Sequence, residues 1–150
     1  MRLSDQEIQR RQSLEELQKL GIDPYPAEKY EVNTNAGEIL DQFNENESRF
    51  SEVSLAGRIM QRRVMGAASF VEIQDSAGRI QAYFKRDDIC PDEDKTLYNI
   101  VFKRHLDIGD IIGVKGSVFR TKMGEITIHV REFRLLAKSL RVLPVVKEKE

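Results

Sequence analysis

The sequence predicts a mainly β fold, a five-stranded Greek-key barrel with a helix between strands three and four and a helical extension at its N-terminus. Two observations lead to this prediction. Apolar and polar residues alternate in four stretches between residues 70 and 131. The expected elements also follow one order, which is a strand, a two-stranded hairpin, a helix and a second hairpin. Because successive side chains of a strand face opposite ways, the alternation indicates a sheet with one buried face.

The alternation divides these strand residues into two sets. The set expected to face the core contains Val71, Ile73, Ile80, Ala82, Phe84, Ile112, Val114, Val118, Ile126, Ile128 and Val130. The set expected to face outward contains Phe70, Glu72, Gln74, Arg79, Gln81, Tyr83, Lys85, Lys115, Ser117, Phe119, Glu125, Thr127, His129 and Arg131. Aromatic rings, amides and cations together are typical of a surface that binds single-stranded nucleic acid.

The N-terminal extension begins with an expected helix. Ser4 and Glu7 form a capping box, and Gly21 supplies a C-terminal glycine signal. Its narrow apolar stripe is expected to contain Ile8, Leu14 and Leu17. The segment GIDPYP, residues 21–26, then predicts an extended or turning path. A second, short helix is expected at about residues 36–43.

The first strand is expected at about residues 52–65, with a bend at Gly57. Asp75-Ser76-Ala77-Gly78 predicts the turn between strands two and three. A helix is expected at about 95–105, and residues 121–124 predict the turn between strands four and five. This order matches a Greek-key OB-fold barrel. SH3-like barrels and five-stranded sandwiches are alternatives that explain the helix position less well.

Length and composition limit the class of protein. The 150 residues fit one domain with flanking elements, divided as an N-terminal helical extension (1–50), an OB-fold domain (51–137) and the start of a linker (138–150). No apolar run approaches the roughly 20 residues that span a bilayer, and the N-terminus does not resemble a signal peptide. The single cysteine, Cys90, excludes an internal disulfide. We therefore expect a cytoplasmic protein without a membrane partner.

The formal net charge of −1 conceals an asymmetry along the chain. Residues 1–50 carry 6 basic and 11 acidic residues, which gives −5, and the other hundred carry 18 and 14, which gives +4. Charge distribution matters more than the total for a local binding face. The modest excess favours recognition of a short single strand over general duplex binding.

Signals of catalysis are missing from the sequence. It contains no nucleophile elbow, HExxH motif, Walker A loop or dinucleotide-binding glycine pattern. His105 and His129 each stand alone, which favours a structural or surface role over metal binding. Cys90 lies in an acidic loop, where an activated thiol is not expected. We predict no catalytic residue, metal site or cofactor for this segment.

The binding candidates lie on the outward face. An exposed Phe70 could stack on a base, a contact worth about 1–3 kcal/mol, although packing under a loop or under the N-terminal helix is the alternative. Gln81, expected on the neighbouring strand, offers a donor and an acceptor to a base edge. Arg62 and Arg63 precede this hairpin.

Three stretches carry a family resemblance that covers nearly the whole chain. They are LEELQKLGIDPYP (14–26), SLAGRIMQRRVMGAASFVEIQDSAGRIQAYFKRDDI (54–89) and GDIIGVKGSVFRTKMGEITIHVREFRLLAKSLRVLP (109–144). They resemble the N-terminal anticodon-binding domain of bacterial-type class II lysyl-tRNA synthetases. RRVMGAASF and GIDPYP together are specific, because related aspartyl and asparaginyl enzymes differ at both places. The family commonly has MGKASF where this chain has Ala67, which removes a phosphate contact.

The resemblance implies roles for particular residues in reading the uridine-rich anticodon of lysine tRNA. Phe70 would stack on an anticodon uridine, Arg62 and Gln81 would bond base edges, and Glu125 would complete the pocket. Cytosine has an amine where uracil has a carbonyl, so Arg62 or Gln81 would reject it. Further cations implied as contacts of the tRNA backbone are Arg10, Arg11, Arg58, Arg63 and Lys122.

The resemblance also implies a longer parent protein. That parent would be a homodimer that activates lysine with ATP and Mg²⁺ and attaches it to tRNA, through a catalytic domain absent from this segment. Two other readings stay open. One is a general module for binding single-stranded nucleic acid, and the other is a subunit-assembly module.

Overall fold

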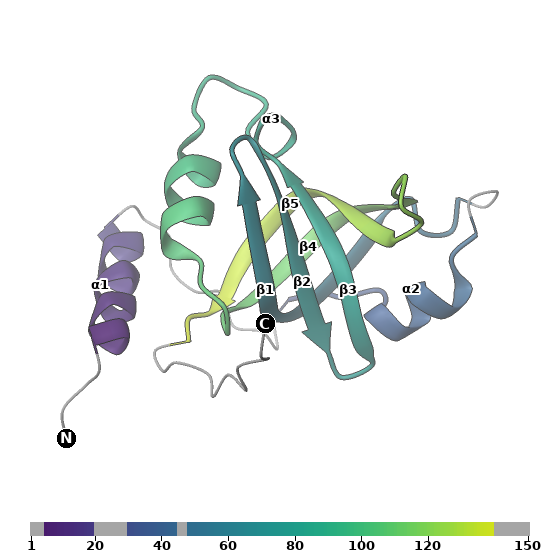
Figure 1. Ribbon diagram of the computed structural model, residues 1–150, viewed down its shortest axis with the longest axis horizontal. Coiled ribbons are helices and arrows are strands. Elements are labelled where there is room, and N and C mark those ends of the chain that lie inside the picture. Colours follow the sequence, from purple (N-terminus) through teal and green to yellow (C-terminus); the bar gives the residue numbers. More distant parts are fainter. Residues whose placement is uncertain (1–4, 20–29, 45–47, 140–150) are drawn as a thin grey trace.

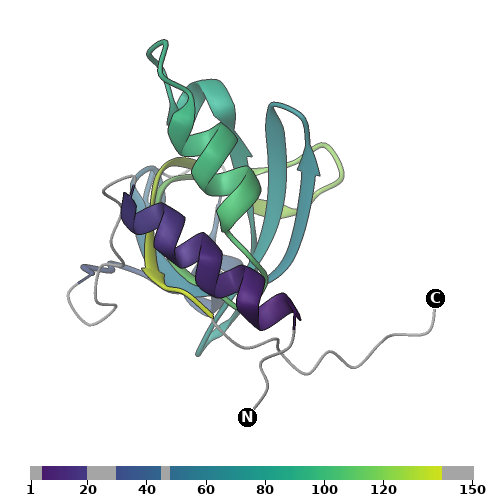
Figure 2. The ribbon, with the colours of Figure 1, turned by 90° about the vertical axis from the view of Figure 1, so that its left-hand side faces the viewer.

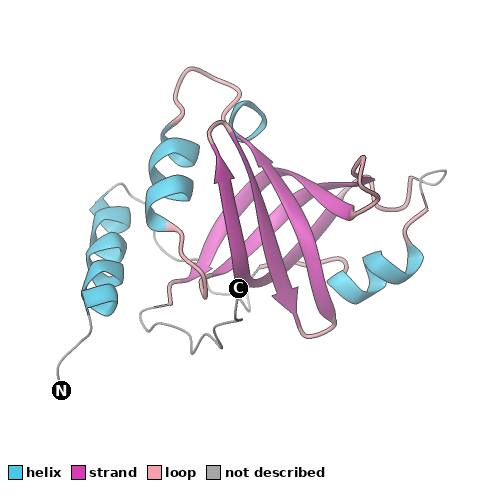
Figure 3. Cartoon of the chain, viewed as in Figure 1, coloured by secondary structure: helices cyan, strands magenta, loops and turns pink. Residues whose placement is uncertain are grey.

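A computed structural model describes residues 5–19, 30–44 and 48–139. The helices are α1 (Asp5–Lys19), α2 (Ala36–Gln42), the short α3 (Arg86–Ile89) and the π-helix η2 (Leu97–His105). The strands are β1 (Val53–Met65), β2 (Ala68–Asp75), β3 (Gly78–Lys85), β4 (Ile111–Arg120) and β5 (Ile126–Ala137). Figures 1 and 3 show the strands wrapped around a common centre, with helices outside them.

The five strands form a closed barrel in the order β1-β2-β3-β5-β4. Neighbouring pairs are antiparallel except β3 and β5, which run parallel where the barrel closes. The predicted five-stranded barrel with a helix between the third and fourth strands is confirmed. Closure also decides against the open two-sheet sandwich, because each strand has a neighbour on both sides.

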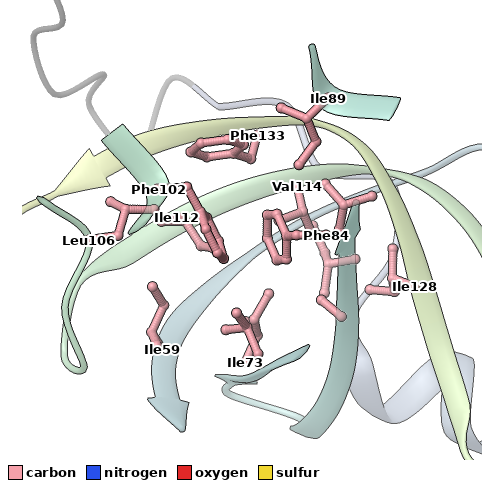
Figure 4. Close-up of a cluster of buried hydrophobic side chains, with 14 of the residues drawn as sticks. Ile59, Ile73, Phe84, Ile89, Phe102, Leu106, Ile112, Val114, Ile128 and Phe133 are labelled. Carbon is pink, nitrogen blue, oxygen red and sulfur yellow. The ribbon is translucent and has the colours of Figure 1, made fainter. Parts of the chain in front are cut away.

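The barrel interior holds the apolar side chains that the alternation assigned to it. Ile73, Phe84, Ile112 and Val114 are fully buried, and Figure 4 shows them converging on the barrel axis. Phe102 of η2 closes one end by packing on Phe84, with ring centroids 4.5 Å apart. Val118 and Ile126, also expected inside, are only partly buried against this core.

The predicted element boundaries are close to the observed ones, with three differences. The helix expected at 95–105 is a π-helix over Leu97–His105, and its last turn is closed by the Leu106 N–H, which donates to the Val101 carbonyl 3.1 Å away. The short helix α3 was not predicted. Strand β5 runs on to Ala137 rather than ending near 131, because Phe133 and Leu135 continue its buried face.

Helix α1 packs against η2 at one side of the barrel, as Figure 2 shows. Its buried side chains are Ser13 and Leu17, and Glu16 lies 3.1 Å from the ring of His105. The predicted stripe is correct for Leu17 but wrong for Ile8, which is 41% exposed. Ile8 lies two and a half turns before Leu17 and so faces the opposite side of the helix, whereas Leu14 is partly buried. The predicted cap at Ser4, Gly21 and the segment 21–26 lie outside the described residues.

Helix α2 matches the second predicted helix, and its N-cap is Asn35. The Asn35 side chain accepts a hydrogen bond from the Glu38 N–H at 2.8 Å. None of the helices described is both long and apolar enough to cross a bilayer.

Candidate nucleic-acid interface

Strand register arranges the outward side chains of β1, β2, β3 and β5 in two rows across the barrel. One row contains Arg63, Phe70, Tyr83 and His129. The next contains Gln61, Glu72, Gln81 and Thr127. Both rows cross strands that are distant in the sequence, so the face exists only in the closed barrel.

Aromatic rings form a continuous cluster on this face. The Phe70 ring lies 5.1 Å from Tyr83 between centroids, and Tyr83 lies 5.5 Å from His129 and 6.4 Å from Phe119. Phe70 is half-buried rather than covered, so its ring is supported by Tyr83 and still presents a surface. The sequence placed Tyr83, Phe119 and His129 on this face without giving them a role, and the signal that groups them is the strand register.

Gln81 is oriented by its neighbour on β5. Its Nε2 donates to Thr127 Oγ1 at 3.1 Å, and that hydroxyl donates to the Glu125 carbonyl at 3.2 Å. Among the described residues, no hydrogen bond is recorded for Gln81 Oε1. Thr127 is fully buried although it belongs to the outward set, because Gln81 and Phe119 are its cross-strand neighbours.

An open cleft of about 380 Å³ lies on the same face. Its walls come from β1, β2, β3 and the turn between β4 and β5, and they include Phe70, Gln81, Glu125 and Arg62. The structure therefore brings the four residues predicted to contact the anticodon to one cleft. Glu72, also in the wall, is paired with Arg79 at 2.9 Å, so part of the negative charge of the cleft is neutralised.

Arg62 differs from Phe70, Gln81 and Glu125 because its guanidinium is bound to backbone carbonyls at the end of η2. Its guanidinium donates to the carbonyls of Phe102 and Lys103 at 2.6 Å each, and also to the Leu106 carbonyl. It lies 5.3 Å from the centroid of the Phe102 ring. Burial lowers its pKa, and the carboxylates of Asp107 and Asp110 oppose that change. These bonds hold the guanidinium against η2, and the Arg62 Nε is buried without a hydrogen-bond partner among the described residues.

The cations predicted as backbone contacts occupy two areas. Arg58, Arg63 and Lys122 are exposed at β1 and at the turn between β4 and β5. Arg10 and Arg11 lie on α1, where Arg10 bonds Ser139 Oγ at 3.4 Å and Arg11 is exposed. A surface hollow joins α1 to β1 and η2, with Arg10, Arg62, Val64 and Lys103 among its lining residues.

His129 is held at the edge of the aromatic cluster by α3. Its Nε2 lies 2.5 Å from Asp88 Oδ2. Elsewhere in residues 5–19, 30–44 and 48–139, His, Cys, Asp and Glu side chains form no group of three or more that could hold a metal ion. The rings and the Gln81 amide are arranged for stacking and hydrogen bonding.

The barrel, its rings and its oriented amide define a nucleic-acid-binding class of protein. Residues 53–136 match the model of the family described as OB-fold nucleic acid binding domain, and the chain belongs to that family. Among curated proteins it is similar to the lysine–tRNA ligase of Porphyromonas gingivalis, 60% identical over 100% of this chain. It is also 60% identical to the Azobacteroides pseudotrichonymphae lysine–tRNA ligase over 99% of the chain, and 50% identical to that of Christiangramia forsetii over 97%.

These matches confirm the resemblance to lysyl-tRNA synthetases. The chain spans only 26%, 29% and 25% of the lengths of these three relatives.

Proposed function

We propose that this chain binds the uridine-rich anticodon of lysine tRNA as the N-terminal domain of a lysine–tRNA ligase. The observation that carries the proposal is the oriented Gln81 amide beside the Phe70 ring in one cleft. An open ring surface binds any base, whereas a fixed amide can distinguish among bases. The similarity to lysine–tRNA ligases over the whole chain supports the choice of RNA.

The chemistry of uracil fits this arrangement. One Nε2 hydrogen of Gln81 is donated to Thr127, which fixes the amide so that its Oε1 can accept the N3–H of uracil. Cytosine has no hydrogen on N3 in its neutral form, so the same oxygen would meet a lone pair. A mismatch of this kind leaves a buried polar atom unpaired, which costs about 1–3 kcal/mol.

Basic residues beside the cleft can bind the phosphates of the RNA backbone. We propose that Arg63, which is paired with Phe70 across β1 and β2, contacts the bound nucleotide, and that Arg58 and Lys122 contact neighbouring phosphates. Arg10 and Arg11 would meet the backbone farther along, past the hollow beside Lys103. Glu125 would accept a hydrogen bond at the rim of the cleft.

The activity of the parent belongs to the same proposal. The relatives are lysine–tRNA ligases, and the parent that we propose is a cytoplasmic homodimer that uses ATP and Mg²⁺ to attach lysine to tRNA. This segment would contribute recognition of the anticodon and no catalytic group.

The test is fluorescence anisotropy of this chain with a labelled lysine anticodon stem-loop and with the same hairpin carrying C for the central U. We expect tighter binding of the U hairpin. Phe70→Ala should weaken binding of both hairpins about tenfold or more, because one stacking contact is lost. Gln81→Leu should bring the two affinities together, because the oriented acceptor is gone.

Lys115→Ala is the matched control, because it removes an exposed cation beside Tyr30, outside the cleft. It should leave the preference for U unchanged. Equal affinity of the unaltered chain for both hairpins would favour a general single-strand module. Absence of binding at both low and moderate salt would favour a subunit-assembly module.

A further inference from the structure

The turn between β4 and β5 is held by hydrogen bonds and carries a highly exposed methionine, Met123. The Thr121 N–H donates to the Glu125 carbonyl and the Gly124 N–H to the Thr121 carbonyl, both at 2.9 Å. The Glu125 N–H donates to Thr121 Oγ1 at 3.1 Å. Gly124 has φ +88°, a conformation that other residues rarely adopt. Three hydrogen bonds thus join Thr121, Gly124 and Glu125, and Met123 lies within the turn that they close.

Met123 is 90% exposed, the largest exposed fraction among the large hydrophobic side chains of the described residues. Single apolar residues are common on surfaces, but this one lines the cleft that contains Phe70 and Gln81. Methionine is flexible and polarisable, and its sulfur makes favourable contacts with aromatic rings. Its place at the rim of an aromatic cleft therefore suits a planar ligand.

We propose that Met123 packs on the outer side of the base that stacks on Phe70, so that the base is held between a ring and a thioether. This inference rests on the proposed function. The occupant is an unpaired nucleobase, because the cleft offers an aromatic surface, an oriented amide and a cation at Arg63. The fixed turn brings Met123 to the cleft without ordering a loop, so little conformational entropy is lost on binding.

Met123 is expected to contribute to the affinity for the hairpin but not to the preference for U over C. A thioether contacts the face of a base and does not read its edge, so it should stabilise uracil and cytosine alike. Met123→Ala should weaken binding of the U and C hairpins by the same factor, about 2- to 10-fold. Met123→Leu should retain most of the affinity. Both variants should melt at the temperature of the unaltered chain, since Met123 is almost wholly exposed.

Oxidation provides an independent test. Mild peroxide converts methionine to its polar sulfoxide, which should lower affinity for the hairpin to the level of Met123→Ala. In the Met123→Leu variant peroxide can oxidise only the other methionines of the chain. Its affinity for the hairpin should not change, because no other described methionine lines the cleft.

The outcomes distinguish this proposal from the one on which it rests. If Phe70→Ala binds like the unaltered chain, the proposed anticodon site is wrong and the role of Met123 fails with it. If Phe70→Ala loses affinity but Met123→Ala does not, only the Met123 contact is overturned. The Met123 contact is also overturned, and the anticodon site is not, if Met123→Ala changes the preference for U over C.

Discussion

Two adjacent arginines on β1 face opposite sides of the barrel wall. Arg62 pairs with the buried Val71, and Arg63 pairs with Phe70 on the outward face. Successive residues of a strand face opposite ways, and a β-bulge between Ile59 and Gln61 decides that Arg63 is the outward one, because it inserts one residue and reverses the faces of those that follow. Uninterrupted alternation from the buried Ile59 would have placed Arg62 outside.

This arrangement predicts different effects for the two arginines. Arg62→Met should lower the free energy of unfolding by about 2–3 kcal/mol, because three carbonyls at the end of η2 lose a charged donor. Arg63→Met should leave unfolding unchanged and weaken binding of the anticodon hairpin, with a shallower salt dependence. Urea unfolding and anisotropy measured on both variants check the assignment. Loss of binding without loss of stability in Arg62→Met would contradict it.

The site could be predicted from the sequence only in part. Alternation correctly placed Phe70 and Gln81 on one face, because β2 and β3 are regular and joined by a tight turn. It could not reveal the bulge, since Met60 carries no bulge signal. It also could not show that Thr127 orients Gln81, because that contact joins strands 46 residues apart.

At the scale of elements, close backbone contact between β4 and β5 depends on Gly116. A Cβ at this position would lie 2.0 Å from the His129 carbonyl oxygen, beside the irregularity between Lys115 and Gly116. The two strands cannot adjust separately, because β4 also pairs with β1 and β5 with β3. A side chain here would separate backbone atoms rather than displace a flexible group.

Gly116→Ala should therefore lower the free energy of unfolding by about 3 kcal/mol, at the upper end for overpacking. Gly78→Ala is the matched control, because its Cβ would meet no atom closer than 3.7 Å. That variant should unfold within about 0.5 kcal/mol of the unaltered chain. Thermal and urea unfolding of the two variants would test this, and equal stabilities would show that the strands can move apart.

The elements that the sequence predicted best are those with local signals. Helix α2 and the turns at 75–78 and 121–124 are specified by neighbouring residues. The π-helical form of η2 and the length of β5 depend on packing against the barrel. The short helix α3 follows β3 directly at Arg86, next to the acidic loop in which the sequence placed Cys90.

At the scale of the whole molecule, a buried ion pair joins the start of β4 to the segment after β5. Lys138 Nζ lies 2.8 Å from Asp110 and 2.6 Å from Asp107. The side chains of Lys138 and Asp110 are 1% and 0% exposed. Burial raises the pKa of Asp110, opposed by Lys138 and by the backbone N–H groups of Asp107 and Ser139.

Lys138→Met should destabilise the chain by about 3–5 kcal/mol at pH 7, because it leaves the Asp110 carboxylate buried without its cation. A raised pKa in the folded state means that the contribution of this carboxyl to stability is greatest at low pH and is lost as the pH rises through that pKa. The deficit of the variant should therefore shrink as the pH falls toward 4.

The double variant Asp110→Asn, Lys138→Met removes both charges and should recover much of the loss at pH 7. Unfolding measured from pH 4 to pH 8 for the single and double variants tests this. A deficit that does not vary with pH would contradict the charge explanation, and leave packing of the lysine stem as the cause.

The parallel pairing of β3 with β5 has a consequence for how binding and folding are linked. Gln81 and Tyr83 meet Thr127 and His129 through this pairing. It is one of two pairings that join β1-β2-β3 to the β4-β5 hairpin, the other being β1 with β4. A chain that has formed its hairpins but not closed would hold the ring of Phe70 without the oriented amide. The proposed selectivity therefore requires the β3–β5 pairing, and a uridine-containing hairpin should protect the backbone amides of β3 and β5 from hydrogen exchange together, as a single cooperative unit.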